Sequence, residues 1–360
     1  MGRMRMEKMG KRALYAWILA GMLLVCASCG QRWEKMPGGQ EEHAGEQAEQ
    51  IDEEREEGGN RPSQSGEKET PLLLKVATTK IPESTGYQGL EMLKDKIERE
   101  SGGTIEVQLY PSEQLGDQMT ILEGIRMGTV EMAFLPVETV GGLFPEIFAL
   151  VSQLRTEEEA IQICQKEEFQ KLWEDLRQSV HIRCMGFSVE GVRNIWVKER
   201  IEDTGDFEGL RLWTSSVSLH MAMFQSLGAS TNSMPLAQAY DGFQAGLLDG
   251  AELDAESILR YNLYEKCKYC LETRHAVSVD TFFMSEEVFQ EMTGEQKVVV
   301  QRAAEEVSIW LQERYERDRD VVYQTLEEKG VTFYRPGDAL RQELEEGLEK
   351  IMWENLQEED

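Results

Sequence analysis

The sequence predicts an α/β fold of two lobes that enclose an inter-lobe cleft, braced by one long helix. Strand and helix patterns alternate from Leu72 onward at the spacing of parallel α/β units, and a second such series begins near Asn194. The stretch from Gln296 to about Lys329 has an apolar stripe and contains no proline or glycine. A helix of that length is roughly 50 Å long, which exceeds one domain of this size, so we expect it to pack against both lobes.

The first unit follows from its periodic patterns. Its predicted elements are a strand over Leu72–Thr78, a helix carrying Leu90, Leu93 and Ile97, a strand over Thr104–Tyr110, a helix over Gln118–Gly128, a strand over Glu131–Leu135, helices through Glu157–Arg177 and a strand over His181–Phe187. Gly102 and Gly103 end the first helix, because glycine adopts the left-handed cap conformation at little cost.

In the second unit, the sequence predicts a similar alternation of strands and helices, after which the chain returns to the first lobe. Its elements are strands at Asn194–Val197, Phe207–Ser216, Ser230–Asn232 and Gly250–Leu253, helices near Val217–Leu227 and Leu236–Gly246, extended segments at Lys268–His275 and Val277–Met284, a strand at Val331–Tyr334 and a helix at Asp338–Gln357. We assign residues 72–191 with 272–318 to lobe I, and residues 192–271 with 319–360 to lobe II. Thr293 and Gln296 form a capping box that starts the long helix.

The N-terminal 29 residues are typical of an export signal. Five basic residues precede the apolar run Ala13–Ala27, which is short for a membrane span but suits a signal sequence. The run ends in small residues before Cys29, which resembles a bacterial lipoprotein signal with Cys29 as the lipid-carrying residue; Cys26 stands where leucine is usual. An uncleaved anchor is the alternative. Either form places the folded part outside the cytoplasm, attached to the membrane.

Residues 30–71 are predicted to be a disordered acidic tether. They are rich in Glu, Gln and Gly and contain almost no aliphatic residues, so they cannot bury enough apolar surface to offset chain entropy. The whole chain has a formal net charge of −29. This charge argues against a nucleic-acid partner, which would require a basic face.

The sequence predicts neither a catalytic site nor a bound metal or cofactor. It contains no nucleophile elbow, phosphate-cradling loop or HExxH motif, and its four histidines lack ligand spacing. Cys267 and Cys270 have CxxC spacing, but no second pair completes a zinc site. We expect them to be buried thiols or an incidental disulfide.

The strand Phe207–Ser216 presents a cation and a ring together. Because side chains alternate along a strand, Arg211 and Trp213 share one face while Leu212 lies on the other. That face either lines the cleft or packs in the core.

From about Leu73 to the C-terminus the chain resembles the solute-binding proteins of tripartite ATP-independent periplasmic (TRAP) transporters, of the dicarboxylate type. The resemblance rests on an ordered set of short motifs rather than on any single one. These are Glu98–Pro111, Gln114–Gly116, Gly128–Met132, Gly191–Arg193, Gly209–Trp213, Gly228–Ala229, Pro235, Tyr240, Gly246–Glu252 and His275.

The resemblance implies a periplasmic-binding-protein-like fold and an extracytoplasmic receptor. Such a receptor captures a small organic solute, in most cases an organic acid, between its lobes and delivers it to the permease subunits of the transporter. In the family, the arginine of a G-L-K-x-R segment binds the ligand carboxylate through two hydrogen bonds, and an arginine of a preceding G-x-R segment supports it. The planar guanidinium suits this role because it offers two parallel hydrogen bonds.

This chain keeps only some of the family's ligand-binding residues. Arg193 matches the supporting arginine, but Trp213 stands in place of the main one, and Arg211 occupies a lysine position. Leu253 replaces an asparagine, next to Glu252. The carboxylate site is therefore rebuilt from Arg193 and Arg211 or absent, and a ring beside carboxylates would equally suit a cationic or aromatic ligand.

We predict six ligand-binding residues, each with an alternative structural role. Arg193 could instead form a salt bridge between strands, Arg211 could face solvent, and Glu252 could cap a loop. Tyr87 and Glu138 are included because they follow strands, where open α/β sheets bind ligands. The six are Arg193, Trp213, Arg211, Glu252, Tyr87 and Glu138.

A second hypothesis assigns the chain a different role. A sensory or interaction lipoprotein with the same fold would no longer serve transport. A neighbouring permease gene would favour the receptor, and an adjacent sensor kinase gene would favour the sensory lipoprotein.

Overall fold

A computed structural model describes residues 70–151, 154–215, 218–344 and 346–347. All of them belong to one compact unit, Gly66–Asp360. The predicted signal peptide, Cys29 and the predicted tether up to residue 69 lie outside the described residues. Among the described helices, none combines the length and the apolar character needed to cross a bilayer.

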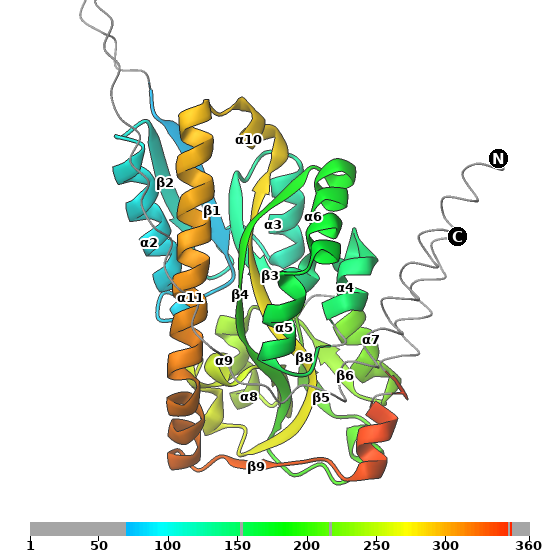
Figure 1. Ribbon diagram of the computed structural model, residues 1–360. Coiled ribbons are helices and arrows are strands. Elements are labelled where there is room, and N and C mark those ends of the chain that lie inside the picture. Colours follow the sequence, from blue (N-terminus) through cyan, green and yellow to red (C-terminus); the bar gives the residue numbers. More distant parts are fainter. Residues whose placement is uncertain (1–69, 152–153, 216–217, 345, 348–360) are drawn as a thin grey trace, which may run out of the picture. The chain divides into compact units, whose positions relative to one another are not determined.

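The described residues form one nine-stranded mixed sheet (Figure 1). The strands pair in the order β2-β1-β3-β8-β4-β7-β5-β6, and β9 pairs with β8. Their bounds are β1 Leu72–Thr78, β2 Ile105–Tyr110, β3 Met132–Pro136, β4 Ile182–Val197, β5 Arg211–Trp213, β6 Ser230–Asn232, β7 Gly250–Leu253, β8 Tyr269–Ser285 and β9 Thr332–Tyr334.

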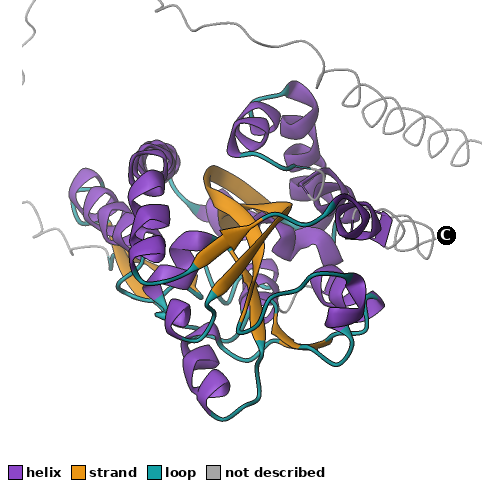
Figure 2. Ribbon diagram, turned by 90° about the horizontal axis from the view of Figure 1, so that it is seen from below, coloured by secondary structure: helices purple, strands orange, loops and turns teal. Residues whose placement is uncertain are grey.

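Helices flank the sheet on both sides (Figure 2). The α-helices are α2 Thr85–Glu100, α3 Gln118–Arg126, α4 Pro145–Val151, α5 Glu157–Cys164, α6 Glu167–Val180, α7 Ser218–Ser226, α8 Ala239–Gln244, α9 Ala255–Arg260, α10 Glu286–Glu291 and α11 Gly294–Glu328. Short 3-10 turns lie at η1 Val137–Gly142, η2 Thr204–Phe207, η3 Leu236–Gln238 and η4 Leu263–Glu265.

Two long strands, β4 and β8, join the two halves of the sheet. At one end, β8 pairs with β3 through Met284 to Asp280; this end, with β1 and β2, is the first sheet half. At the other end, β4 pairs with β7 through Asn194 to Val197; this end, with β5 and β6, is the second sheet half. Between them β4 and β8 pair antiparallel, with register shifts near Val189 and Arg193.

The predicted breaks inside these two strands are wrong. The sequence separates His181–Phe187 from Asn194–Val197, yet both belong to β4, and the two extended segments after Lys268 both belong to β8. Gly186 and Gly191 lie at the register shifts of β4. Such bulges interrupt the alternation of side chains without ending the strand, so the period-2 pattern is lost while pairing continues.

The strand directions bring the carboxyl ends of both halves together. β1, β2 and β3 run parallel to one another, as do β5, β6 and β7. Because β3 is antiparallel to β8, β8 to β4 and β4 to β7, the strands of the two halves run in opposite directions. Their carboxyl ends therefore meet over the middle of β4 and β8, where open sheets commonly bind ligands.

The long helix contributes to the cores of both halves, as the sequence predicts. Its residues Val300 to Tyr315 pack with β1, β2 and α2 in one hydrophobic cluster. Val322 and Leu326 belong to a second cluster with Trp196 and residues of α8 and α9. In Figure 1, α11 passes α2 near its start and α9 further along. A third cluster covers the other face of the second half with α7 and Leu340.

Other boundaries differ from the sequence in detail. The helix predicted over Glu157–Arg177 is two helices, α5 and α6, and Leu236–Gly246 is a 3-10 turn followed by α8. The strand Phe207–Ser216 is reduced to Arg211–Trp213. Residues 338–344 are helical, and the predicted continuation to Gln357 lies largely outside the described residues. The residue boundaries of lobes I and II stay a prediction.

Candidate functional site

Buried polar side chains gather where the carboxyl ends of the two halves meet. Lys80 follows β1, Glu138 follows β3, and Thr214 follows β5; all three are less than a tenth exposed. Arg193 on β4 and Asp280 on β8 come from the middle of the long strands. A concentration of buried charge is costly unless it is paired or receives a ligand, so we treat this place as the candidate functional site.

Arg193 forms a forked ion pair with Glu252 of β7. Its Nε donates to Glu252 Oε1, and its Nη2 donates to Oε2 at 2.8 Å and to the Glu252 carbonyl at 3.0 Å. Nη1 donates to Ser278 Oγ at 3.3 Å. The guanidinium is 4% exposed and Glu252 is fully buried. The pair thus links β4, β7 and β8, as in the alternative expected for Arg193, while a ligand role stays a prediction.

Two histidines complete the surroundings of Glu252. His275 Nε2 lies 2.9 Å from Glu252 Oε1, and His275 Nδ1 lies 2.7 Å from the Thr273 hydroxyl. His220 Nδ1 lies 3.8 Å from Glu252 Oε2 and 3.1 Å from the Ser215 hydroxyl. Both imidazoles are buried, and His275 has partners on both nitrogens, as expected for a structural histidine in a strand.

The protonation of this group follows from burial and pairing. Burial would raise the pKa of Glu252, but the guanidinium of Arg193, helped by His220 and His275, holds it well below its ordinary value. Burial lowers the pKa of His220 to about 4 and also lowers that of His275. Glu252 is therefore ionised and both histidines are neutral near pH 7.

Glu138 lies beside Arg193 but is poorly paired. It is 3% exposed, and its Oε1 is 3.8 Å from Arg193 Nη1, too far for a hydrogen bond. Neither carboxylate oxygen accepts a hydrogen bond from a described residue. Burial raises the pKa of Glu138 to about 7, although Arg193 acts in the opposite direction.

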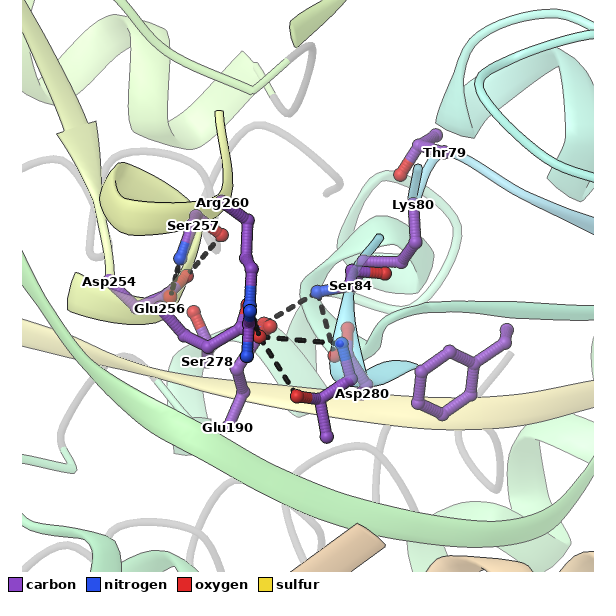
Figure 3. A network of polar contacts seen from close by, with 12 residues as sticks. Thr79, Lys80, Ser84, Glu190, Asp254, Glu256, Ser257, Arg260, Ser278 and Asp280 are labelled. Atoms are coloured by element: carbon purple, nitrogen blue, oxygen red, sulfur yellow. Dashed lines mark hydrogen bonds and ion pairs between the residues drawn. The ribbon is translucent and has the colours of Figure 1, made fainter. Parts of the chain in front are cut away.

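A second group of charges, drawn in Figure 3, includes Asp280, whose charge acts on Glu138 of the first group. Lys80 Nζ lies 2.5 Å from Glu190 Oε2 and 3.0 Å from Asp280 Oδ2. The contact with Asp280 is an ion pair without hydrogen-bond alignment, since the Asp280 oxygens have no hydrogen-bond donor among the described residues. Burial would lower the pKa of Lys80, but Asp280 and Glu190 raise it, while burial raises that of Glu190.

Contacts in this second group connect the two sheet halves. The Thr85 hydroxyl at the start of α2 donates to Glu256 Oε1 of α9 at 2.9 Å, and Arg260 Nε donates to the same oxygen at 2.9 Å. Asp254 caps α9 by accepting from the backbone and hydroxyl of Ser257. In Figure 3, Asp254, Glu256, Ser257 and Arg260 lie together on one side, and Lys80 and Ser84 lie on the other.

Three of these carboxylates, Glu190, Asp254 and Glu256, have oxygens within 4.8 Å of one another. Lys80, Arg260 and Ser257 supply donors to them, so the positive charge comes from the protein itself. A cavity of about 30 Å³ lies next to the group and is lined by Thr85 and Tyr315 among others. It has room for a water molecule and no organic solute.

The remaining predicted site residues lie elsewhere. Arg211 is at the exposed start of β5, where Nε and Nη2 bind the carboxylate of Asp249 at 2.6 and 2.7 Å. Tyr87 lines a surface groove between α2 and β2. Trp213 packs in the core of the second half, 6% exposed, with Nε1 donating to the Met234 carbonyl at 2.8 Å. The structure therefore brings together Arg193, Glu252 and Glu138 and places the other three apart.

Sequence reasoning missed Lys80, Glu190, Asp280 and His220 as members of the site. A signal was present for three of them. Lys80 directly follows the first apolar strand, and Glu190 and Asp280 are single acids within otherwise apolar strand segments. A lone charge in a buried strand must find a partner, so these positions pointed to one ionic cluster. No comparable pattern marks His220.

The four cysteines in the described residues are unpaired thiols. Cys267 and Cys270 are fully buried in the core of the second half and are not bonded to each other. Of the two alternatives that the sequence allowed, the structure therefore shows buried thiols and no disulfide. Burial raises the pKa of both, which keeps them protonated and unreactive.

The comparisons with known proteins agree with this architecture. Residues 76–359 match the family described as bacterial extracellular solute-binding protein, family 7. An uncharacterised protein of Haemophilus influenzae is 26% identical over 216 residues, which is 59% of this chain and 65% of that protein. The sialic acid-binding periplasmic protein of Vibrio cholerae is 25% identical over 236 residues, 65% of this chain and 74% of that protein.

A solved structure shows the same fold. The TRAP periplasmic solute-binding protein from Sulfitobacter sp. NAS-14.1, with bound β-D-galacturonate, superposes with a TM-score of 0.72 at 19% identity. The match covers 79% of this chain and 94% of that one. The family match spans most of the chain and includes every residue of the candidate site, so the chain belongs to the bacterial extracellular solute-binding proteins of family 7.

Proposed function

We propose that this protein is the extracytoplasmic receptor of a TRAP-type permease and captures a small organic acid at the meeting point of the two sheet halves. Family membership supports a solute-binding role, and the family implies permease subunits as partners. Sialic acid and galacturonate, named for the Vibrio cholerae relative and the Sulfitobacter structure, both carry a carboxylate.

The observation that carries this proposal is the buried guanidinium of Arg193. It lies between strand ends of both halves, with Glu252 from the second half at one edge and Glu138 from the first half 3.8 Å from Nη1. A solute bound there would contact both halves at once. Closure over the solute is then the signal that the permease reads.

Ligand-dependent stabilisation tests the receptor function. Native mass spectrometry of the purified protein would identify a co-purified solute, and a thermal-shift panel of organic acids, amines and aromatic acids would extend the search. A bound solute at a hundred times its Kd should add about 2.7 kcal/mol to the unfolding free energy. No co-purified molecule and no shift across the panel would contradict the receptor function.

Paired arginine variants test the place of the site. Arg193→Lys keeps the charge but loses the fork, so we expect at least a tenfold rise in Kd for the solute found above. Arg211→Lys is the matched control, because that side chain lies in an exposed ion pair with Asp249. Equal affinity of the Arg193 variant and the control variant would place the solute elsewhere.

We propose that Cys29 carries a lipid that holds the receptor at the outer face of the cell membrane. The support is the basic and apolar segment before Cys29 and the acidic segment after it. Metabolic labelling with a fatty acid should mark the wild type and not Cys29→Ser. Labelling that persists in Cys29→Ser would contradict this.

A further inference from the structure

Carboxyl groups outnumber cationic side chains at the candidate site. Six buried or half-buried carboxyl groups contact or adjoin three cationic side chains, and we call these nine residues the ionic network. Its members are Glu138, Glu190, Glu252, Asp254, Glu256 and Asp280, with Lys80, Arg193 and Arg260. Arg155 hydrogen-bonds the His275 carbonyl at the edge of the network, and carboxyl groups remain in excess when it is included.

The guanidinium of Arg193 has little capacity left for a ligand. Of its five N–H groups, three donate to Glu252 and one to Ser278. One N–H of Nη1 remains, which suffices for a single carboxylate oxygen. Arg211, the other predicted arginine, is bound to Asp249 on the surface. The site can therefore hold one carboxylate weakly but cannot clamp two.

Glu138, in contrast to Arg193, has all of its hydrogen-bonding capacity left for a ligand. Both of its oxygens are buried and accept no hydrogen bond from the described residues, and the nearest cation is 3.8 Å away. The Thr214 hydroxyl, which follows β5, is likewise fully buried and has no hydrogen-bond partner among the described residues. A buried carboxylate without donors is unfavourable, and a donor that also carries positive charge compensates it best.

We propose that the solute carries a protonated amino group as well as a carboxylate, and that Glu138 binds the ammonium while the free N–H of Arg193 binds the carboxylate. This inference rests on the proposed receptor function and names its ligand class: an amino-acid-like zwitterion. The ammonium adds a positive charge where carboxyl groups outnumber cations, and its N–H groups supply donors for the unused oxygens of Glu138.

The pH dependence of binding should follow Glu138. The charged groups that face it are Arg193 of β4, Asp280 of β8 and Glu252 of β7. Arg193 and Glu252 stay ionised from pH 6 to 8, because each holds the other's charge. Since burial raises the pKa of Glu138 to about 7, it must lose a proton to receive an ammonium. Affinity for an amino acid should then be about tenfold weaker at pH 6 than at pH 8.

Matched pairs of solutes test the inference by calorimetry on the full chain, after unfolding and refolding to remove co-purified molecules. Each pair shares one carbon skeleton: alanine and lactate, glutamate and 2-hydroxyglutarate, phenylalanine and phenyllactate, with galacturonate as a reference acid. We expect at least one amino member to bind tenfold or more tighter than its hydroxy partner. In Glu138→Gln, that preference and the pH dependence should both be lost.

The variant should fold, because the amide is isosteric and removes a buried charge, and Glu313→Gln on the exposed face of α11 is the matched control. Hydroxy acids or galacturonate that bind as tightly as the amino acids would overturn the inference and leave the receptor function standing. Unchanged amino-acid binding in Glu138→Gln would also overturn it. No binding by any solute would count against the receptor function itself.

Discussion

Glu138 makes the stability of the ligand-free protein depend on pH. Its folded pKa is about 7, above the ordinary value of an unfolded glutamate, so the folded state binds the proton more tightly. Its contribution is fully present below about pH 4.5 and is lost as pH rises towards 7, a change of roughly 3 kcal/mol in the unfolding free energy. In Glu138→Gln this loss should be absent.

Urea unfolding from pH 5 to 8 measures this difference. The unfolding free energy of Glu138→Gln should increase relative to that of the wild type as pH rises, and the difference should be largest near pH 8. Glu313→Gln should follow the wild type throughout. Parallel curves for Glu138→Gln and the wild type would show that Glu138 titrates at an ordinary pKa.

At the scale of single residues, three of the six predicted residues meet in the candidate site, and their role in binding stays a prediction. Arg193, Glu252 and Glu138 meet because they lie at strand ends or in mid-strand, which the pattern and the family resemblance both indicate. Arg211 and Trp213 share a strand, but β5 has only three residues, so Arg211 reaches solvent and Asp249 at its start. Strand alternation gives the face of a side chain and says nothing about where the strand ends.

Among the elements, α11 should be the most sensitive to loss of packing. Leu311 is fully buried and meets Gly89 of α2 so closely that a methyl group on that glycine would contact it at 2.9 Å. Leu311→Ala should lower the unfolding free energy by about 2–5 kcal/mol because the cavity cannot close across two helices. Ile309→Ala, 60% exposed on the same helix, should change it by less than about 0.5 kcal/mol.

Urea midpoints at an unchanged slope would measure both effects. A similar loss in the two variants would mean that helix propensity, and not packing against α2, sets the contribution of α11.

The elements differ in how well the sequence predicts them. The strands β1, β6 and β7 and the helix α11 have nearly the predicted bounds, because each has a clear period and a clear stop signal. β4 and β8 were divided, since bulges disturb their alternation while their partners hold the strand together. That pairing is a long-range property that no local pattern records.

For the whole molecule, the net charge of −29 should make stability rise with salt. Like charges repel more strongly in the compact state, and raising the salt from about 0.01 M to 0.15 M shortens the screening length from about 30 Å to about 8 Å. We expect a gain of about 1 kcal/mol, or roughly 2–4 °C in Tm. Choline chloride should act like sodium chloride; an effect of sodium alone would indicate a bound ion instead of screening.

The paths of β4 and β8 decide when the chain can fold during its synthesis. The core of the first half joins Leu74 and Val107 to Val300 and Leu311, and one core of the second half joins Ile195 and Leu212 to Leu340. Each core thus lacks part of its packing until residues between Val300 and Leu344 have been synthesised. We therefore expect neither core to close before that part of the chain has been made, so that segments far apart in the sequence must meet before either half of the sheet is stable.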